Sequence, residues 1–230
     1  MAWFVTSTGK PPAVPLRPAA LLRRVLLTPV LPPPRPRRLL RLYAGLYLYG
    51  LGSALLIAAD LGAMPWDVLH QGLARWTGLS VGTCSIMVGA LLMLVWIPLR
   101  QRPGLGTLSN VVVVGLSVDA SLWWLPEAGH LAVRAGYLVA GVLVTAVATA
   151  CYIGARLGPG PRDGLMTGLA ARGLSVRRAR TGIEIAVVLT GVLLGGTLGV
   201  GTVVFALAIG PLAQVLLPLF DVGPPPAARP

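Results

Sequence analysis

Two stretches of this sequence, LGAMPWDVLHQGL at Leu61–Leu73 and LGPGPRDGLMTGL at Leu157–Leu169, share the pattern L-G-x-x-P-x-D-x-L-x-x-G-L. The pattern combines helix-breaking glycine and proline with one carboxylate and several apolar anchors. The similarity continues beyond it, because GLSV occurs at Gly78 and again at Gly173. A spacing of 95 residues then holds through later Gly-x-Gly-Thr motifs. A constant spacing over so long a segment indicates that half of the chain is duplicated.

The composition is that of a membrane protein. Of the 230 residues, 55% are hydrophobic and only 11% are charged, and the mean hydropathy is +0.79. Soluble domains carry about a quarter charged residues. The net charge of +12 would suggest nucleic-acid binding if it covered a folded surface. It lies instead in an N-terminal tail and in short gaps between apolar runs, which argues against a nucleic-acid partner.

Six apolar runs reach the roughly 20 residues that a bilayer span needs. They are residues 39–59, 79–99, 106–125, 131–155, 177–196 and 201–220. The repeated stretch falls between the first and second runs and again between the fourth and fifth. Each copy holds about a dozen residues of helix after its proline, too few to cross a bilayer.

The basic residues support this topology. If all six runs cross, all but two of the 19 basic residues lie on one side, and only Arg75 and Arg134 lie on the other. Cytoplasmic loops of membrane proteins carry the excess of Arg and Lys. Both termini are therefore expected in the cytoplasm. Because Lys10 is the only lysine and Ala, Gly and Pro are abundant, the sequence suggests a GC-rich bacterial genome, and the spans are expected in a bacterial plasma membrane.

The sequence thus predicts an all-α membrane protein of six transmembrane helices. They form two inverted three-helix repeats, each with a short broken or re-entrant helix after its first span, because an odd number of spans turns the second copy over. The predicted parts are a disordered Pro/Arg-rich tail (1–38), a first repeat (39–125), a second repeat (126–220) and a C-terminal cytoplasmic tail (221–230).

The repeated motif places a carboxylate near the start of each short helix. Asp67 and Asp163 each follow a proline by two residues, and a carboxylate in a first helical turn faces unpaired N–H groups. The residues that make the breaks are Gly62, Pro65, Gly158 and Pro161. Two interpretations remain open. The motif caps a short interfacial helix, or two re-entrant helices meet near a pseudo-twofold axis and hold a polar solute.

Two further carboxylates, Asp119 and Glu184, lie inside apolar runs, where a charge is costly without a partner or a cavity. Glu184 follows Arg180 by four residues, so a helical ion pair explains it. Asp119 has no partner nearby in the sequence. It is therefore the best single candidate for a functional charge.

The Gly-x-Gly-Thr motifs at Gly104 and Gly199 open the third and sixth runs. Their amides could receive an anion, but a tight turn with a threonine cap explains them better. His70 and His130 stand alone near run ends, and little in their surroundings indicates a ligand role.

No enzyme signature or cofactor site is present. Cys84 and Cys151 are isolated within apolar runs, so neither a disulfide nor a zinc site is indicated. The histidines complete no catalytic set with serine, and no metal or cofactor is expected.

Three segments resemble the YczE/YitT-type bacterial integral membrane proteins: ADLGAMPWDVLHQGLARWTGLSVG, IPLRQRPGLGT and YIGARLGPGPRDGLMTGL. The resemblance covers roughly Arg38–Phe220, and the long Pro/Arg-rich tail is unlike the family's usual short start. It implies a polytopic inner-membrane protein whose biochemical activity is not established. No catalytic residues are carried over from it.

The paired helix breaks favour a transporter or channel for a small solute or ion at the repeat interface, since a plain anchor would not need them. Asp67, Asp163 and Asp119 would be its polar contacts. The expected partners are the lipid bilayer and this small molecule or ion. The alternative is a scaffold or assembly partner in the membrane that transports nothing.

Overall fold

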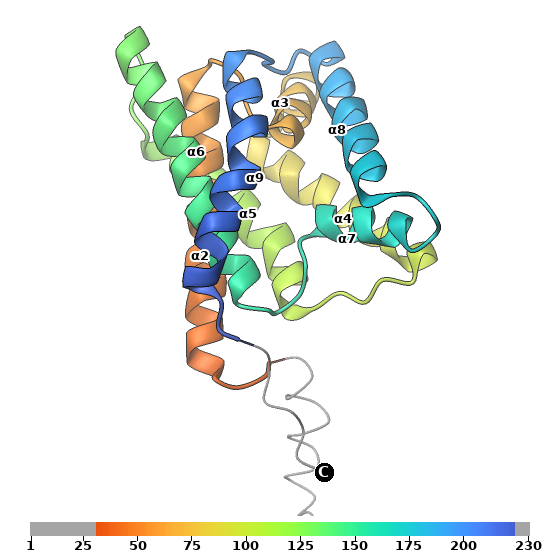
Figure 1. Ribbon diagram of the computed structural model, residues 1–230. Helices are drawn as coiled ribbons and strands as arrows, with labels where there is room; N and C mark the ends of the chain where they lie inside the picture. Colours follow the sequence, from red (N-terminus) through yellow and green to blue (C-terminus); the bar gives the residue numbers. More distant parts are fainter. Residues whose placement is uncertain (1–30, 224–230) are drawn as a thin grey trace, which may run out of the picture.

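The computed structural model describes residues 31–223 and contains, over that range, eight α-helices and no β-strand (Figure 1). In chain order they are α2 (Arg35–Ala59), α3 (Pro65–Thr77), α4 (Val81–Leu99), α5 (Leu105–Trp124), α6 (Leu131–Gly154), α7 (Pro161–Ala170), α8 (Val176–Leu193) and α9 (Val200–Phe220). This confirms the all-α prediction. Residues 1–30 and 224–230, which hold most of both predicted tails, lie outside the described residues.

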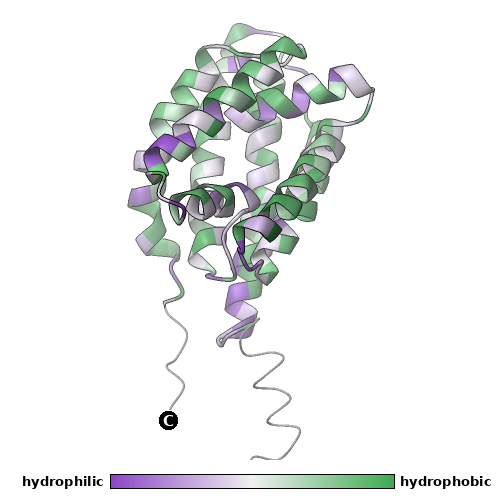
Figure 2. Cartoon of the chain, turned by 90° about the vertical axis from the view of Figure 1, so that its right-hand side faces the viewer, coloured by the Kyte–Doolittle hydropathy of each residue, from purple (hydrophilic) through white to green (hydrophobic). Residues whose placement is uncertain are grey.

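Five of these helices, α2, α4, α5, α6 and α9, are long and apolar enough to cross a membrane. Large apolar side chains such as Leu91, Ile97 and Leu207 are exposed, as expected where lipid is the solvent. Hydrophobic residues predominate along the long helices (Figure 2). The predicted fifth span corresponds to α8, which is not among the five helices because it carries three arginines and a glutamate. Its role as a sixth span stays a prediction.

The helix of the first predicted span begins earlier than the sequence suggested. α2 starts at Arg35, inside the segment 1–38 that was predicted to be a disordered tail. Prolines at the start do not prevent this, because the first N–H groups of a helix need no partner within it. Arg38 is fully buried, and its Nη1 donates to the carbonyl of Ala155 at 2.9 Å. This long-range hydrogen bond fixes the first turn.

The two short helices begin where the repeated motif places them. α3 starts at Pro65 and α7 at Pro161, each with an aspartate in its first turn. The glycines before them, Gly62 and Gly158, have φ angles of +113° and +121°, a region that side chains with a Cβ rarely enter. With 13 and 10 residues, neither helix is long enough to cross a bilayer.

Each chain break is closed by the start of a distant helix. The N–H of Gly201, at the start of α9, donates to the carbonyl of Leu61 at 2.7 Å. The N–H of Gly106, at the start of α5, donates to the carbonyl of Leu157 at 2.8 Å. The two contacts are reciprocal, and they satisfy carbonyl groups that would otherwise be unpaired in an apolar medium.

The Gly-x-Gly-Thr motifs make this close approach possible. The N–H groups of Gly104 and Gly199 donate to the hydroxyls of Thr107 and Thr202, at 3.1 and 3.4 Å, so the threonines cap α5 and α9. A Cβ added at either Gly104 or Gly199 would overlap the carbonyl oxygen of the chain break packed against it.

At the centre of the molecule, α2 packs against α6, with α5 beside α2 and α9 beside α6. Arginines tie both ends of the central pair. Arg38 reaches the end of α6, as described above, and Arg134 of α6 donates from Nε to the carbonyl of Ala59 at 2.7 Å and pairs with Asp60 at 2.5 Å. Arg134 thus has a structural partner that its place in the sequence did not reveal.

The end of α9 is attached to the end of α6 by an ion pair. Arg156 donates from Nε and Nη2 to the two carboxylate oxygens of Asp221, at 2.7 and 2.6 Å. Hydrogen bonding from this guanidinium lowers the pKa of the Asp221 carboxyl group. The pair therefore contributes most at neutral pH and weakens as acid protonates the carboxylate.

The two copies of the repeat differ in one packing contact. α4 packs along α5, whereas α8 and α9 lie apart (Figure 1). A Cβ at Gly115 of α5 would lie 2.5 Å from the carbonyl oxygen of Gly82 in α4, but a Cβ at Gly210 would have no described atom within 4 Å. Arg177 stands 95 residues after Gly82. A side chain of that size cannot enter a glycine contact, so α8 stays away from α9 there.

We predict that Gly104→Ala and Gly199→Ala each destabilise the protein by about 1–3 kcal/mol, because overpacking against a backbone carbonyl cannot be relieved by a side-chain rotation. Thermal unfolding of the purified protein in detergent measures the effect as a lower Tm. Gly136→Ala is the matched control, since a Cβ there meets nothing within 4 Å. An unchanged Tm in both variants would contradict the close approach.

Candidate functional site

The first turns of α3 and α7 meet inside the molecule. The guanidinium carbon of Arg162 lies 4.9 Å from the centroid of the Trp66 ring, within the range of a cation–π contact. These two residues occupy the same position in the two copies of the motif. The indole N–H of Trp96, in α4, donates to the carbonyl of Pro161 at 3.0 Å and holds the start of α7 in place.

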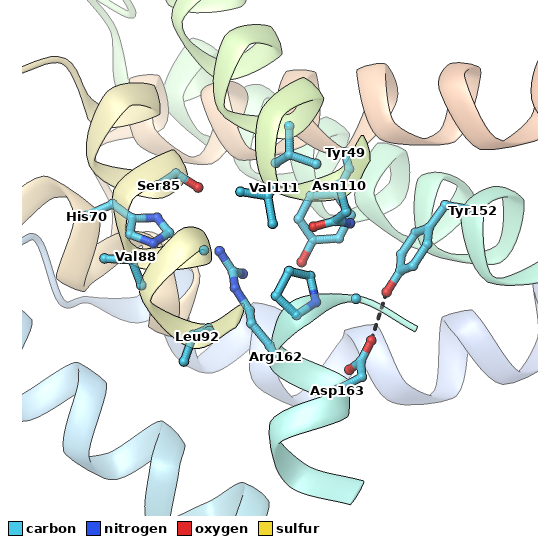
Figure 3. A pocket seen from close by; sticks show the side chains of 14 residues that line it. Tyr49, His70, Ser85, Val88, Leu92, Asn110, Val111, Tyr152, Arg162 and Asp163 are labelled. Carbon is cyan, nitrogen blue, oxygen red and sulfur yellow. Dashed lines mark hydrogen bonds between the residues drawn. The ribbon is translucent and has the colours of Figure 1, made fainter. Parts of the chain in front are cut away.

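A small cavity of about 60 Å³ lies on one side of this meeting point. Its wall includes side chains of α4 and α5 together with the start of α7 (Figure 3). The polar groups that line it come from Tyr49, His70, Ser85, Asn110, Tyr152, Arg162 and Asp163. In Figure 3 the Arg162 side chain extends toward His70 and Ser85, whereas Asp163 points toward Tyr152. The cavity therefore has a cationic end and an anionic end.

A larger cavity of about 340 Å³ lies on the other side, between α6, α8 and α9. Its wall is more apolar and contains Met64, Phe205 and Ile209. It also holds the ion pair of Arg180 and Glu184, whose Nε and Oε1 are 2.9 Å apart. The pairing that the sequence suggested for Glu184 is present.

Four residues line both cavities: Tyr49, Tyr152, Arg162 and Asp163. The Tyr152 hydroxyl donates to Oδ2 of Asp163 at 3.0 Å. The Tyr49 and Tyr152 rings stand edge to face with centroids 6.2 Å apart. These four side chains form the partition between the two cavities. A partition that carries a guanidinium, a carboxylate and two phenols can bind a polar solute from either side.

The structure places the three predicted aspartates in different surroundings. Asp163 lies in the partition, but Asp67 is only 4% exposed and lines neither cavity. Its Oδ2 accepts a hydrogen bond from Ser53 at 2.5 Å and its Oδ1 lies 3.1 Å from His70 Nδ1. Asp67 thus lies behind His70, which does face the small cavity. The two aspartates of the motif therefore differ in position: Asp163 lines both cavities, and Asp67 contacts the cavity-lining His70 from behind.

Asp119 lies away from both cavities. Its Oδ1 accepts from the N–H of Gly82 at 2.7 Å and its Oδ2 accepts from the Ser80 hydroxyl at 2.5 Å. Both donors are at the start of α4, where the N–H groups of a helix need acceptors. In this arrangement Asp119 caps α4 from the neighbouring helix α5.

The break residues divide into two that line the cavities and two that lie outside them. Pro65 lines the larger cavity and Pro161 the small one. Gly62 and Gly158 contact the starts of α9 and α5 instead. They set the direction in which the two short helices enter.

The sequence did not single out Arg162, Tyr49 or Tyr152. The cytoplasmic excess of arginine accounts for Arg162 without a functional role. The signal for such a role was that Arg162 occupies the motif position that Trp66 occupies in the other copy. Within the described part of the chain, no group of three or more His, Cys, Asp or Glu side chains could hold a metal ion.

Comparisons with known proteins give a family but no activity. The profile of a "Family of unknown function (DUF6198)" matches residues 36–218. An "Uncharacterized protein" of Haemophilus influenzae is 42% identical over 173 residues, which cover 75% of this chain and 79% of that protein. The "Uncharacterized membrane protein YczE" of Bacillus subtilis is 33% identical over 182 residues, covering 76% and 83%. No solved structure matches the chain.

We predict that Asp119→Ala lowers the free energy of unfolding by about 1–2 kcal/mol, because two donors at the start of α4 lose their acceptor. Thermal unfolding in detergent measures the change. The matched control is Glu127→Gln on the exposed loop after α5, which should alter stability by less than about 0.5 kcal/mol. Equal stability of Asp119→Ala and wild type would show that Asp119 is not a cap.

Proposed function

The chain belongs to this DUF6198 family of unknown function, and on that premise we propose that it moves a small polar solute or ion across the bacterial inner membrane. The path runs through the partition of Tyr49, Tyr152, Arg162 and Asp163, between two inverted halves of three spans each. Both chain termini lie in the cytoplasm. Of the predicted polar contacts, Asp163 meets the solute, Asp67 acts through His70, and Asp119 keeps α4 in place.

Reciprocal contacts support the two inverted halves. The break at Leu61 accepts from the start of α9, and the break at Leu157 accepts from the start of α5. Arg38 and Arg134 make equivalent contacts with the ends of α6 and α2. In each pair of contacts, a residue of one half donates to the other half, and the equivalent residue of the other half donates back. A pseudo-twofold axis between two related units requires such pairs.

The sixth span of the proposal is α8. Its charged residues all fall in its first half, and the segment from Ile185 to Leu193 is free of charge. Arginines at one end of a span mark the cytoplasmic side, and the pairing of Arg180 with Glu184 reduces the cost of placing a carboxylate near the lipid.

The observation that carries the proposed function is that the two cavities are lined by equivalent positions of the two halves. Ser85, Gly89, Asn110, Val111 and Val114 line the small cavity, and the residues 95 positions later, Arg180, Glu184, Phe205, Ala206 and Ile209, line the larger one. Paired compartments on either side of a shared polar partition are expected when a solute is passed between two sides of a membrane.

The size difference of the cavities suggests how passage is controlled. The small cavity is narrow because α4 packs along α5, and the larger one is wider because α8 lies apart from α9. A solute in the larger cavity reaches the partition directly. It leaves through the small cavity only when α4 separates from α5.

The partition selects the chemistry of the solute. Arg162 offers hydrogen-bond donors to an acceptor group, Asp163 offers an acceptor to a donor group, and the tyrosine rings cover apolar surface. A compact solute with both kinds of polar group fits this arrangement.

The direct test is transport by the protein in proteoliposomes, with a panel of amino acids, short carboxylates, ammonium and alkali cations. We expect current or uptake with at least one class, reduced about tenfold or more in Arg162→Gln and Asp163→Asn, since each loses a charged hydrogen-bonding group. Glu127→Gln should transport as wild type does. Absence of any signal across the panel, or full activity in both partition variants, would refute the proposed path.

A disulfide between α4 and α5 tests the gate. A Cβ at Gly89 would lie 3.6 Å from Cβ of Val111, a separation that suits a disulfide. In a chain with Cys84 and Cys151 replaced by alanine, Gly89→Cys with Val111→Cys should stop transport when oxidised and regain it on reduction. Either single cysteine is the control and should be insensitive to oxidation. Undiminished transport by the cross-linked protein would show that α4 and α5 do not separate.

An exposed apolar groove supports the second candidate, a scaffold that transports nothing. The groove lies between α8 and α9 and is lined by residues such as Ile185, Leu189, Val203 and Leu207. Contiguous apolar surface between spans can receive a helix of another protein. If the protein is a scaffold, Arg162→Gln, Asp163→Asn and the disulfide between α4 and α5 should still complement a strain that lacks the gene. Polar substitutions in the groove, such as Leu207→Gln, should fail to complement it.

A further inference from the structure

His70 carries a buried nitrogen that the fold itself does not use. The side chain is 1% exposed, and its Nε2 has no hydrogen-bond partner among the residues of the 31–223 range. Buried polar atoms are nearly always paired, so an unpaired one needs an explanation. His70 lines the small cavity (Figure 3), and its free nitrogen is therefore available to something inside it.

The other ring nitrogen fixes the state of the imidazole. Nδ1 lies 3.1 Å from Oδ1 of Asp67, whose Oδ2 accepts from the Ser53 hydroxyl at 2.5 Å. An ionised carboxylate only accepts hydrogen bonds, so Nδ1 carries the proton in neutral His70. Nε2 is then left with a lone pair, which makes it a base inside the cavity.

The cavity can bring a proton to this base. About 60 Å³ exceeds the roughly 10–15 Å³ that one water molecule needs by the same measure. Ser85 and Asn110 supply polar partners for water along the wall. The small cavity shares the four-residue partition with the larger cavity. Only this partition, which is the proposed solute site, separates His70 from the larger cavity.

The charged groups around His70 act in opposite directions on a proton at the ring. On its own helix the charged neighbour is Asp67, and on α7 they are Arg162 and Asp163. α2 and α6 contribute the phenols of Tyr49 and Tyr152, α4 holds no charged residue, and the charged pair of α8 lies in the larger cavity. Asp67 favours a proton on His70 and Arg162 opposes it, while Asp163 points away toward Tyr152. Because these opposing charges act in a medium of low dielectric constant, proton binding at His70 depends on what neutralises Arg162.

We propose that Nε2 of His70 binds a proton that moves together with the solute, an assignment whose transport step rests on the proposed function. The proton joins the nitrogen lone pair and gives an imidazolium that Asp67 stabilises. Arg162 opposes this positive charge until the acceptor group of a solute binds to its guanidinium. Solute and proton therefore favour each other's binding, and linkage makes the effect equal in both directions.

The chain has only two histidines, which permits a direct test of proton binding. In His130→Gln protein with ¹⁵N-labelled histidine, reconstituted in lipid without a histidine tag, nitrogen NMR reports on His70 alone. We expect the Nδ1–H form at high pH and one reversible conversion to imidazolium between about pH 8 and pH 4. An Nε2–H form, or no conversion over that range, would overturn the assignment.

The coupling is tested by transport. His70→Gln keeps a donor for Asp67 but cannot take up a proton. In His70→Gln, accumulation driven by a pH gradient should fall by about tenfold or more relative to solute exchange at equal pH in the same variant. In His130→Gln this ratio should equal that of wild type. Wild-type accumulation by His70→Gln would refute coupling at this residue. If no variant moves any solute, the proposed function fails, and the NMR titration still decides whether the proton site exists.

Discussion

Backbone hydrogen bonds across the two chain breaks are the contacts on which the rest of the structure depends. A span that ends within an apolar medium must pair its last carbonyl groups, because water is absent there. The carbonyls of Leu61 and Leu157 are paired by the N–H groups of Gly201 and Gly106, each from the far part of the chain. These hydrogen bonds let α3 and α7 enter the molecule as short helices, and their first turns then meet and build the partition.

The asymmetry of the site comes from differences between the two copies of the motif. Where one copy has Trp66 the other has Arg162, and where one has His70 the other has Met166. The first difference creates a contact between the copies, at 4.9 Å, and the second leaves a single base on one side. Related backbones have thus acquired unlike side chains at the place where they touch. In the proposed duplicated arrangement, related backbone contacts therefore surround an asymmetric site.

The features that the sequence predicted well are those encoded by neighbouring residues. The proline starts of α3 and α7, the threonine caps of α5 and α9 and the pair of Arg180 with Glu184 all join residues within a few positions. Asp119 had no such neighbour. Its two partners at the start of α4 are 37 and 39 residues away, and an apparently unpaired charge proved to be a cap. Tyr49 and Tyr152 were missed for the same reason, since a cavity wall joins side chains from elements that no local spacing connects.

The reciprocal closure of the breaks also constrains how such a chain could have arisen. In the proposed inverted arrangement, neither half pairs its own broken carbonyl, because each depends on the Gly-x-Gly-Thr start of the other. An ancestral gene that encoded one half would have needed two identical chains inserted in opposite orientations to complete the same hydrogen bonds. Duplication and fusion would then have freed each orientation to accumulate its own arginines, as the proposed arrangement requires.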